Sequence, residues 1–382
     1  MEFVTGLKGI FDTSGLPLFL PSWGNWIMIV VGLILIVLAV KFKFEPLLLI
    51  PISLGCILVN IPLPKELASA WIGQPGVGFL SIIYDAITKT EITPIIMFLC
   101  LGALTDFSPL LERPITFLLG AAAQFGVFVA IFLALTLGFN IKEAAAIGII
   151  GGADGPTAIF IAQKMAPQIL GAIAVSAYSY MSLVPIILPP VIRCMTTKKE
   201  RTTRMELAKP VSKTTKMLFP IVVTLVVGIL LPSSVQLIGM LMAGNFIKEC
   251  GLVERLSNTL QNELVNINTV FLGLTVGSTM AAQQFLTPAT LKIILLGFLA
   301  FAFSAAGGVA LGKLMYLLSG GKINPMIGAA GVSAVPMSAR TVQKEGQRED
   351  PGNFLLMPAM GPNVAGVLGT AVAAAALIAL LS

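Results

Sequence analysis

The chain has 382 residues, of which 56% are hydrophobic and only 11% are charged, and its net charge is +6. An ordinary soluble domain carries roughly 25% charged residues, so this composition excludes a water-soluble globular protein. Histidine is absent, so any protonation chemistry must use carboxylates, tyrosine, lysine, water or a substrate.

Apolar stretches long enough to cross a bilayer recur along the chain. A spanning helix needs about 20 mostly apolar residues. The clearest candidates are Asn25–Val40, Ile92–Asp106, Pro114–Phe139, Gln168–Ile192 and Thr290–Leu318. So many runs with so few charges predict an all-α polytopic membrane protein.

We predict that residues 1–24, which precede the first run, form an interfacial segment, with Trp23 and Trp26 at the level of the lipid headgroups. After this first apolar run come Lys41 and Lys43, and then more apolar sequence. It lacks the small-residue cleavage site that ends a signal peptide, so it predicts a retained membrane helix.

The excess positive charge lies in the middle of the chain. Residues 193–216 contain eight lysines and arginines against two glutamates, which accounts for the whole net charge. Nucleic-acid binding is a poor interpretation because no aromatic residues are interleaved. The positive-inside rule instead predicts a cytoplasmic linker, which separates a first transmembrane repeat at 25–192 from a second at 217–382.

The two halves contain related segments. A shift of 180 residues places IGIIGGADGPTAIFIAQK (147–164) on IGAAGVSAVPMSARTVQK (327–344), and six of the eighteen positions are identical, including Pro156 with Pro336. This similarity predicts an internal duplication. Each half then carries a transmembrane helix broken by glycine and proline, and paired breaks of this kind mark substrate or ion sites in membrane transporters.

Asp154 lies in the first break and is the only acidic residue between Glu143 and Glu200. Packing of a GxxxG pair, Gly151 and Gly155, is the alternative interpretation, but it explains the glycines and not the aspartate. A carboxylate inside the membrane is costly unless it is paired or hydrated. Asp154 therefore predicts an ion- or proton-binding role.

The second half supplies neutral oxygen atoms. Asn324 precedes Pro325, Ser333 lies in the second break, and Asn363 lies beside a further Gly-Pro interruption at Gly361. We expect the two breaks to meet, which would bring these three side chains close to Asp154. Oxygen ligands with one formal negative charge suit a monovalent cation better than Ca²⁺ or Zn²⁺, so Na⁺ or a proton is the predicted occupant.

One further motif has a simpler explanation. GGVALGKL, from Gly307, matches the GxxxxGK pattern of a phosphate-binding loop, but Leu314 replaces the serine or threonine that such a loop uses for Mg²⁺. The match also lies inside an apolar run, so membrane packing is the better interpretation.

The motifs GGADGPTAIF, VSAYSYM, NPMIGAAGVSAVPMSAR and GPNVAGV together resemble the β subunit of the sodium-pumping biotin-dependent decarboxylases, which include oxaloacetate, methylmalonyl-CoA and glutaconyl-CoA enzymes. The resemblance implies a multi-pass subunit of the cytoplasmic membrane that decarboxylates carboxybiotin, consumes a proton and exports Na⁺. It also implies inverted repeats and an elevator-like core that moves against a scaffold. The short segments near Pro46 and Val235 leave the number of crossings open, so the sequence alone does not show inversion.

The resemblance implies partners as well: a carboxyltransferase α subunit, a biotin carrier subunit, a small membrane subunit and further copies of the β subunit. The chain itself has no AMKM-like tetrapeptide of the kind that carries biotin. It also lacks a soluble insertion associated with some oxaloacetate-type subunits, which favours an acyl-CoA type.

Seven residues match positions to which the family assigns roles. Asp154 matches an essential intramembrane aspartate that exchanges Na⁺ for a proton. Tyr180 and Arg340 are the other predicted catalytic residues. The resemblance implies Na⁺ binding by Asp154, Asn324, Gly328, Ser333 and Asn363.

Arg340 is also the predicted binding residue for carboxybiotin, because an arginine fork holds a carboxylate through two parallel hydrogen bonds. The alternative is an arginine whose side chain extends to the membrane interface. The alternative function for the whole chain is an autonomous Na⁺-coupled solute carrier. Such a carrier needs no partner subunits, whereas a decarboxylase subunit does. A purely structural anchor would leave Asp154 unexplained.

Overall fold

The computed structural model describes residues 21–61, 78–152, 154–206 and 210–381. Within these ranges all regular secondary structure is helical. Six helices are long and apolar enough to cross a membrane, and a seventh span results if the bent pair Phe79–Thr88 and Ile92–Leu104, which meet at 58°, is counted as one. The predicted class of an all-helical polytopic membrane protein is confirmed.

The first half contains α3 (Trp23–Lys41), α4 (Pro46–Val59), α6 (Phe79–Ile83), η1 (Tyr84–Thr88), α7 (Ile92–Leu104), α8 (Ser108–Glu112), η2 (Pro114–Thr116), α9 (Phe117–Ala123), α10 (Phe125–Thr136), α11 (Ile141–Gly148), η3 (Ile149–Gly152), α12 (Gly155–Met165), η4 (Pro167–Ile169) and α13 (Leu170–Met195). The segment near Pro46 is thus a helix of 14 residues. The interfacial segment predicted for residues 1–24 lies mostly outside the described residues, and Trp23 opens α3.

The linker and second half contain α14 (Lys198–Arg201), α15 (Lys213–Leu230), η5 (Pro232–Ser234), η6 (Val235–Gly239), α16 (Met240–Cys250), α17 (Glu254–Thr259), η7 (Leu260–Leu264), α18 (Val265–Ser278), α19 (Ala282–Phe285), α20 (Pro288–Leu318), η8 (Pro325–Gly331), α21 (Met337–Glu349) and α22 (Leu356–Leu381). Two of the six long helices, α15 and α22, are additional to the runs singled out in the sequence. The interruption expected at Gly361 is wrong, because α22 continues through Pro362.

Apolar side chains cover much of the outer surface. On α10, Phe128 and Phe132 are exposed, and on α15 the same is true of Leu225 and Ile229. An exposed apolar surface of this extent is unfavourable in water and suits contact with lipid.

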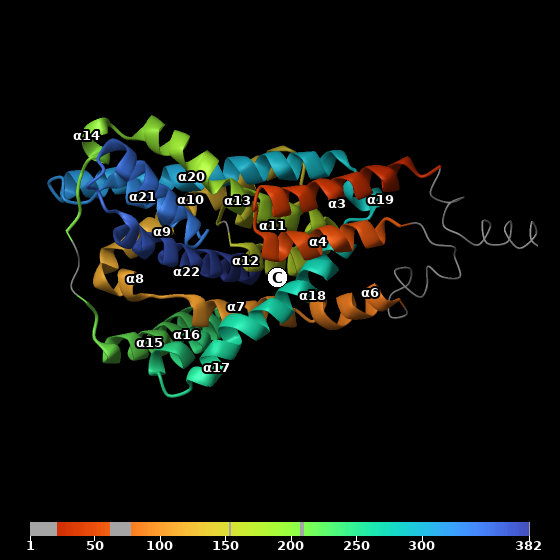
Figure 1. Cartoon of the computed structure of the whole chain (residues 1–382), viewed down its shortest axis with the longest axis horizontal. Coiled ribbons are helices and arrows are strands. Elements are labelled where there is room, and N and C mark those ends of the chain that lie inside the picture. Colours follow the sequence, from red (N-terminus) through yellow and green to blue (C-terminus); the bar gives the residue numbers. More distant parts are fainter. Residues whose placement is uncertain (1–20, 62–77, 153, 207–209, 382) are drawn as a thin grey trace, which may run out of the picture.

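The helices α3 and α4 form a hairpin that turns back near the middle of the molecule, whereas α14 and α21 lie at its left end in Figure 1. The hairpin tip carries Lys41, Lys43 and Glu45, and the last two have left-handed backbone angles (φ 57° and 34°). Such angles are unfavourable for residues with a side chain, so the surrounding packing holds this turn in place.

Helix α4 crosses α18 at very short range. A Cβ atom added to Gly55 would lie 2.4 Å from the carbonyl oxygen of Leu274, and one added to Gly277 would lie 2.1 Å from that of Ile52. Each glycine therefore faces the carbonyl group three residues before the other glycine, and no larger residue fits.

The crossing of α7 with α16 has the same geometry. A Cβ atom on Gly102 would lie 1.8 Å from the carbonyl oxygen of Leu241, and one on Gly244 would lie 1.9 Å from that of Leu99. Here too each glycine faces the carbonyl three residues before its partner. One helix pair thus joins α4 of the first half to α18 of the second, and the other joins α7 to α16 in the same manner.

Ion pairs attach the basic linker to α21. Arg201 Nε lies 3.0 Å from Glu349 Oε1, and Arg204 binds both carboxylate oxygens of Asp350 at 2.8 and 3.0 Å. The Arg204 guanidinium holds the pKa of Asp350 below its usual range. The linker therefore fixes the end of α21 that lies farthest from the second helix break.

Candidate functional site

The two helix breaks contact each other through their backbones. The first follows η3 and ends where α12 begins at Gly155, and the second separates η8 from α21. The backbone N–H of Ser333 in the second break donates to the carbonyl oxygen of Gly152 in the first, at 3.0 Å. Ala153 is outside the described residues, but Asp154, two residues after Gly152, is described.

Asp154 is a buried carboxylate with little to neutralise it. Its side chain is 5% exposed, and it accepts a hydrogen bond from the Thr157 hydroxyl. In the described ranges that is its only hydrogen-bond partner, and Asp154 forms no ion pair there. It directly precedes α12, whose free N–H groups favour negative charge. A buried charge with one neutral partner is strongly unfavourable unless a cation or a proton joins it.

Tyr178 on α13 packs against Gly155, the residue that directly follows Asp154. A Cβ atom on Gly155 would lie 2.6 Å from the Tyr178 hydroxyl, so only glycine fits at this position. The hydroxyl is buried and has no hydrogen-bond partner among the described residues. Sequence reasoning missed Tyr178 and selected Tyr180, two residues later.

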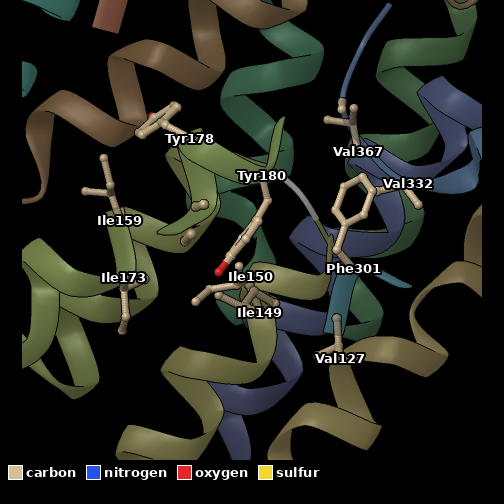
Figure 2. Close-up of a cluster of buried hydrophobic side chains, with 14 of the residues drawn as sticks. Val127, Ile149, Ile150, Ile159, Ile173, Tyr178, Tyr180, Phe301, Val332 and Val367 are labelled. Carbon is tan, nitrogen blue, oxygen red and sulfur yellow. The ribbon is translucent and has the colours of Figure 1, made fainter. Parts of the chain in front are cut away.

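Tyr180 faces α20 instead. Its hydroxyl donates to the carbonyl oxygen of Ile294, and its ring lies edge-on to Phe298 with centroids 6.3 Å apart. Figure 2 shows Tyr178 and Tyr180 leaving α13 in different directions, with Tyr180 directed toward Ile150. The contacts of Tyr180 thus hold α13 against α20.

Asn363 presents a free oxygen atom at the second break. Its amide nitrogen donates to the carbonyl oxygens of Ala330 and Val332, at 3.0 and 2.7 Å. Its amide oxygen is buried and accepts no hydrogen bond from a described residue. An amide oxygen left free in this way is a suitable ligand for a hard cation.

Hydroxyl groups continue the polar cluster from Ser333. The Ser333 hydroxyl lies 3.0 Å from that of Thr370 on α22, and Thr370 lies 3.5 Å from the Gly152 carbonyl oxygen. The side chain of Gln124 lies 3.3 Å from Thr370 as well. Sequence reasoning missed Thr370 and Gln124, since each is an isolated polar residue in a long apolar run.

The side chain of Asn324, a predicted Na⁺ ligand, binds backbone groups of the linker and of η8. Its amide nitrogen donates to the carbonyl oxygens of Arg201 and Thr203, at 3.1 and 2.7 Å, and its oxygen accepts from the Met326 N–H at 2.9 Å. It therefore fastens the start of η8 to the linker, because its amide already serves three backbone groups.

Gly328 contributes through its lack of a side chain. A Cβ atom on Gly328 would lie 2.0 Å from the carbonyl oxygen of Gly308, and the reverse contact is equally short. These two glycines allow η8 to lie directly against α20. The position of Gly328 is explained by this close packing.

Arg340 lies in the first turn of α21, seven residues after Ser333. Its side chain is exposed and forms no ion pair with a described residue. Its guanidinium group is therefore available to bind an anion, and it follows the second break closely in the sequence.

Comparison with known proteins gives a consistent result. Residues 24–381 match the family model described as the Na⁺-transporting oxaloacetate decarboxylase beta subunit. The chain is 55% identical to the glutaconyl-CoA decarboxylase subunit beta of Acidaminococcus fermentans, over 99% of this chain and 98% of that protein. It is 54% identical to the methylmalonyl-CoA decarboxylase subunit beta of Veillonella parvula, over 100% and 99%. With the oxaloacetate decarboxylase beta chain 2 of Salmonella typhi the identity is 47%, over 96% and 97%.

Proposed function

The chain belongs to the family of the Na⁺-transporting oxaloacetate decarboxylase β subunit, and we propose that Na⁺ and a proton exchange on Asp154 where its two helix breaks meet. Membership makes the protein a multi-pass membrane subunit of a decarboxylase coupled to Na⁺ transport. The observation that carries the proposal is the buried Asp154 carboxylate, which has one neutral hydrogen-bond partner in the described residues.

In this proposal Na⁺ binds between the Asp154 carboxylate and the neutral oxygen atoms of the second break. The free amide oxygen of Asn363 and the hydroxyl of Ser333 are the candidates on that side. Thr370 and the Gly152 carbonyl oxygen extend the set. Asn324 and Gly328 contribute indirectly, by holding η8 in place.

The chemical step is the decarboxylation of carboxybiotin. The bond between the carboxyl carbon and the ureido nitrogen breaks, CO₂ leaves, and the electron pair stays on the nitrogen, which takes up one proton. Arg340 holds the carboxylate and stabilises the negative charge that develops. Asp154 supplies the proton, and the resulting carboxylate binds Na⁺. Tyr180 acts as a positioning residue, through its contact with α20.

The partners are part of the same proposal. A biotin carrier subunit brings carboxybiotin, a carboxyltransferase α subunit loads the carrier, and a small membrane subunit and further β copies complete the assembly. The substrate class we propose is an acyl-CoA. The relatives of that type named above are 54–55% identical to this chain. The alignment with the Salmonella typhi oxaloacetate-type chain extends over 419 positions, so that relative has residues with no counterpart in these 382.

We further propose that the two halves are inverted copies of one unit. The matching glycine contacts of the crossing α4–α18 and the crossing α7–α16 support two related copies, as does the order of elements, since α12 and α13 follow the first break as α21 and α22 follow the second. Their inverted orientation is what the family resemblance implies. In an elevator-like cycle these four crossed helices would form the scaffold. The broken segments with α13, α20 and α22 would form the moving core.

Proteoliposomes containing the membrane subunits test the function. Addition of carboxylated carrier should produce CO₂ release, proton consumption and Na⁺ uptake in fixed proportion, all dependent on Na⁺. Decarboxylation at full rate without Na⁺ would contradict the proposal. Na⁺-driven solute uptake by the β chain alone would support the autonomous carrier instead.

A further inference from the structure

A groove between α13 and α21 lies at the end of the molecule that carries the basic linker. Its volume of about 660 Å³ is within the range of small-molecule sites. The α13 wall includes Pro185, Ile186, Pro189 and Pro190, and the α21 wall includes Lys344 and Arg348.

The groove has an excess of positive charge. Arg193 and Glu345 neutralise each other through two hydrogen bonds of 2.7 and 2.6 Å. Lys344 and Arg348 are exposed, and neither forms an ion pair with a described residue. Two cations on one wall therefore remain free to bind an anion.

The opposite wall is apolar. Three prolines and Ile186, whose side chain is 64% exposed, present a rigid surface without hydrogen-bond donors, because proline has no N–H group. Together the walls suit an elongated ligand that combines an aliphatic stem with a carboxylate.

The groove also leads toward the helix breaks. On α21, Thr341 in its wall directly follows Arg340, and the helix begins next to the second break. On α13, Pro185 lies seven residues after Tyr178, which is about two helical turns. Both walls therefore extend from the basic end toward the residues around Asp154.

We propose that this groove receives the carboxylated biotin arm of the carrier subunit, with Lys344 and Arg348 attracting the carboxylate and the prolines contacting the aliphatic stem. The inference rests on the proposed function and adds to it the path by which the ligand reaches Arg340. An arm of this kind is attached to a protein at one end, so an open groove serves it better than a closed cavity.

The test uses the full chain with its membrane partners in proteoliposomes, supplied either with separately carboxylated carrier subunit or with free carboxybiotin. The double variant Lys344→Gln/Arg348→Gln should raise the KM for both ligands about tenfold, since exposed charge contacts contribute up to about 1 kcal/mol each. The Na⁺ concentration for half-maximal activity should not change. The control is Lys198→Gln/Lys199→Gln, which removes the same charge from exposed positions on α14.

A second variant keeps the charges and fills the groove. Ile186→Trp should raise both KM values severalfold and should fold normally, because Ile186 is 64% exposed. An unchanged KM in both variants, with an active parental protein, would overturn the groove. A rise for the carrier subunit alone would overturn it too, since the groove would then bind the carrier protein and not the biotin arm. If the parental protein decarboxylates neither ligand, the proposed function itself fails.

Discussion

The two helix breaks are related in sequence but differ in their chemistry. The first holds a buried charge, Asp154, with a single neutral partner. The second holds neutral groups, and most of their hydrogen bonds are made within the second half. When the two segments are aligned with a shift of 180 residues, Asp154 corresponds to Ala334 and Ser333 corresponds to Ala153. Each half thus supplies one polar side chain where the other half has alanine. A cation site that combines one carboxylate with a neutral hydroxyl group therefore needs both breaks.

The strongest test of this comparison removes the charge from the first break. We expect Asp154→Asn to lower Na⁺-dependent decarboxylation by about two to four orders of magnitude, the range contributed by acid–base groups. Assay of CO₂ release in proteoliposomes measures this, with Glu254→Gln on the exposed face of α17 as control. Normal Na⁺ uptake by the Asn variant would show that the two breaks do not differ in the way we describe.

The next test changes Arg340, the cation that follows the second break. Arg340→Lys keeps the charge but removes the two parallel hydrogen bonds. The rate of carboxybiotin decarboxylation should fall about tenfold or more, as for the loss of roughly 1.4 kcal/mol of binding, with little change in Na⁺ affinity. Arg255→Lys on α17 is the control. A lysine variant that decarboxylates at the parental rate would make Arg340 an interfacial residue only.

A smaller effect is expected from the neutral oxygen atoms. Ser333→Ala should raise the Na⁺ concentration for half-maximal activity about threefold to tenfold, as loss of one ligand worth roughly 1 kcal/mol requires. The matched control is Ser338→Ala, since the Ser338 hydroxyl is also buried but has no partner among the described residues. If both variants changed the Na⁺ dependence equally, Ser333 in the second break would not be a Na⁺ ligand.

The two tyrosines of α13 are expected to differ, Tyr178 in its effect on turnover and Tyr180 in its effect on stability. Tyr180→Phe loses the hydrogen bond to Ile294 and should lower the free energy of unfolding by about 1 kcal/mol. Tyr178→Phe removes a buried hydroxyl without a partner in the described residues, so it should leave stability unchanged or raise it while slowing turnover. Thermal unfolding and turnover, measured on both variants, test this. The opposite pattern would return the catalytic role to Tyr180.

The smallest effect concerns the attachment of α21 to the linker. The pKa of Asp350 is below its usual range in the folded protein because of Arg204. This ion pair therefore contributes stability above the pKa of an unfolded aspartate, about 3.9, and the contribution disappears as pH falls through the folded value. Arg204→Gln should remove that part of the acid dependence of thermal unfolding. An identical pH profile in the variant would contradict the prediction.

The sequence was sufficient to find the first break and its charge. Asp154 is isolated in an apolar region beside glycine and proline, and that contrast is visible without a structure. The choice between Tyr178 and Tyr180 depends on which face of α13 meets Gly155. Two tyrosines in the motif YSY have the same composition around them, so the sequence holds no information on that rotation.

Other features could not be read from the sequence for a similar reason. Asn324, a predicted Na⁺ ligand, donates to backbone carbonyls more than a hundred residues away in the chain. Pro362 was expected to interrupt a helix. It is the seventh residue of α22, so it leaves the carbonyl group of Pro358 without its helical hydrogen bond, and yet the helix continues, as helices inside membrane proteins do when neighbouring groups compensate. The partners of Asn324 are backbone groups, whose positions depend on the fold and not on residue type.

The hydrogen bond between Ser333 and Gly152 has a consequence for sequence variation. Both of its atoms belong to the main chain, so a substitution at position 333 keeps the donor unless the new residue is proline. Position 152 is more restricted, because a Cβ atom there would lie 2.5 Å from the Thr370 side chain. The contact between the breaks thus depends on main-chain atoms and on one glycine. It does not require the two segments to share side chains, and only six of their eighteen aligned positions are identical.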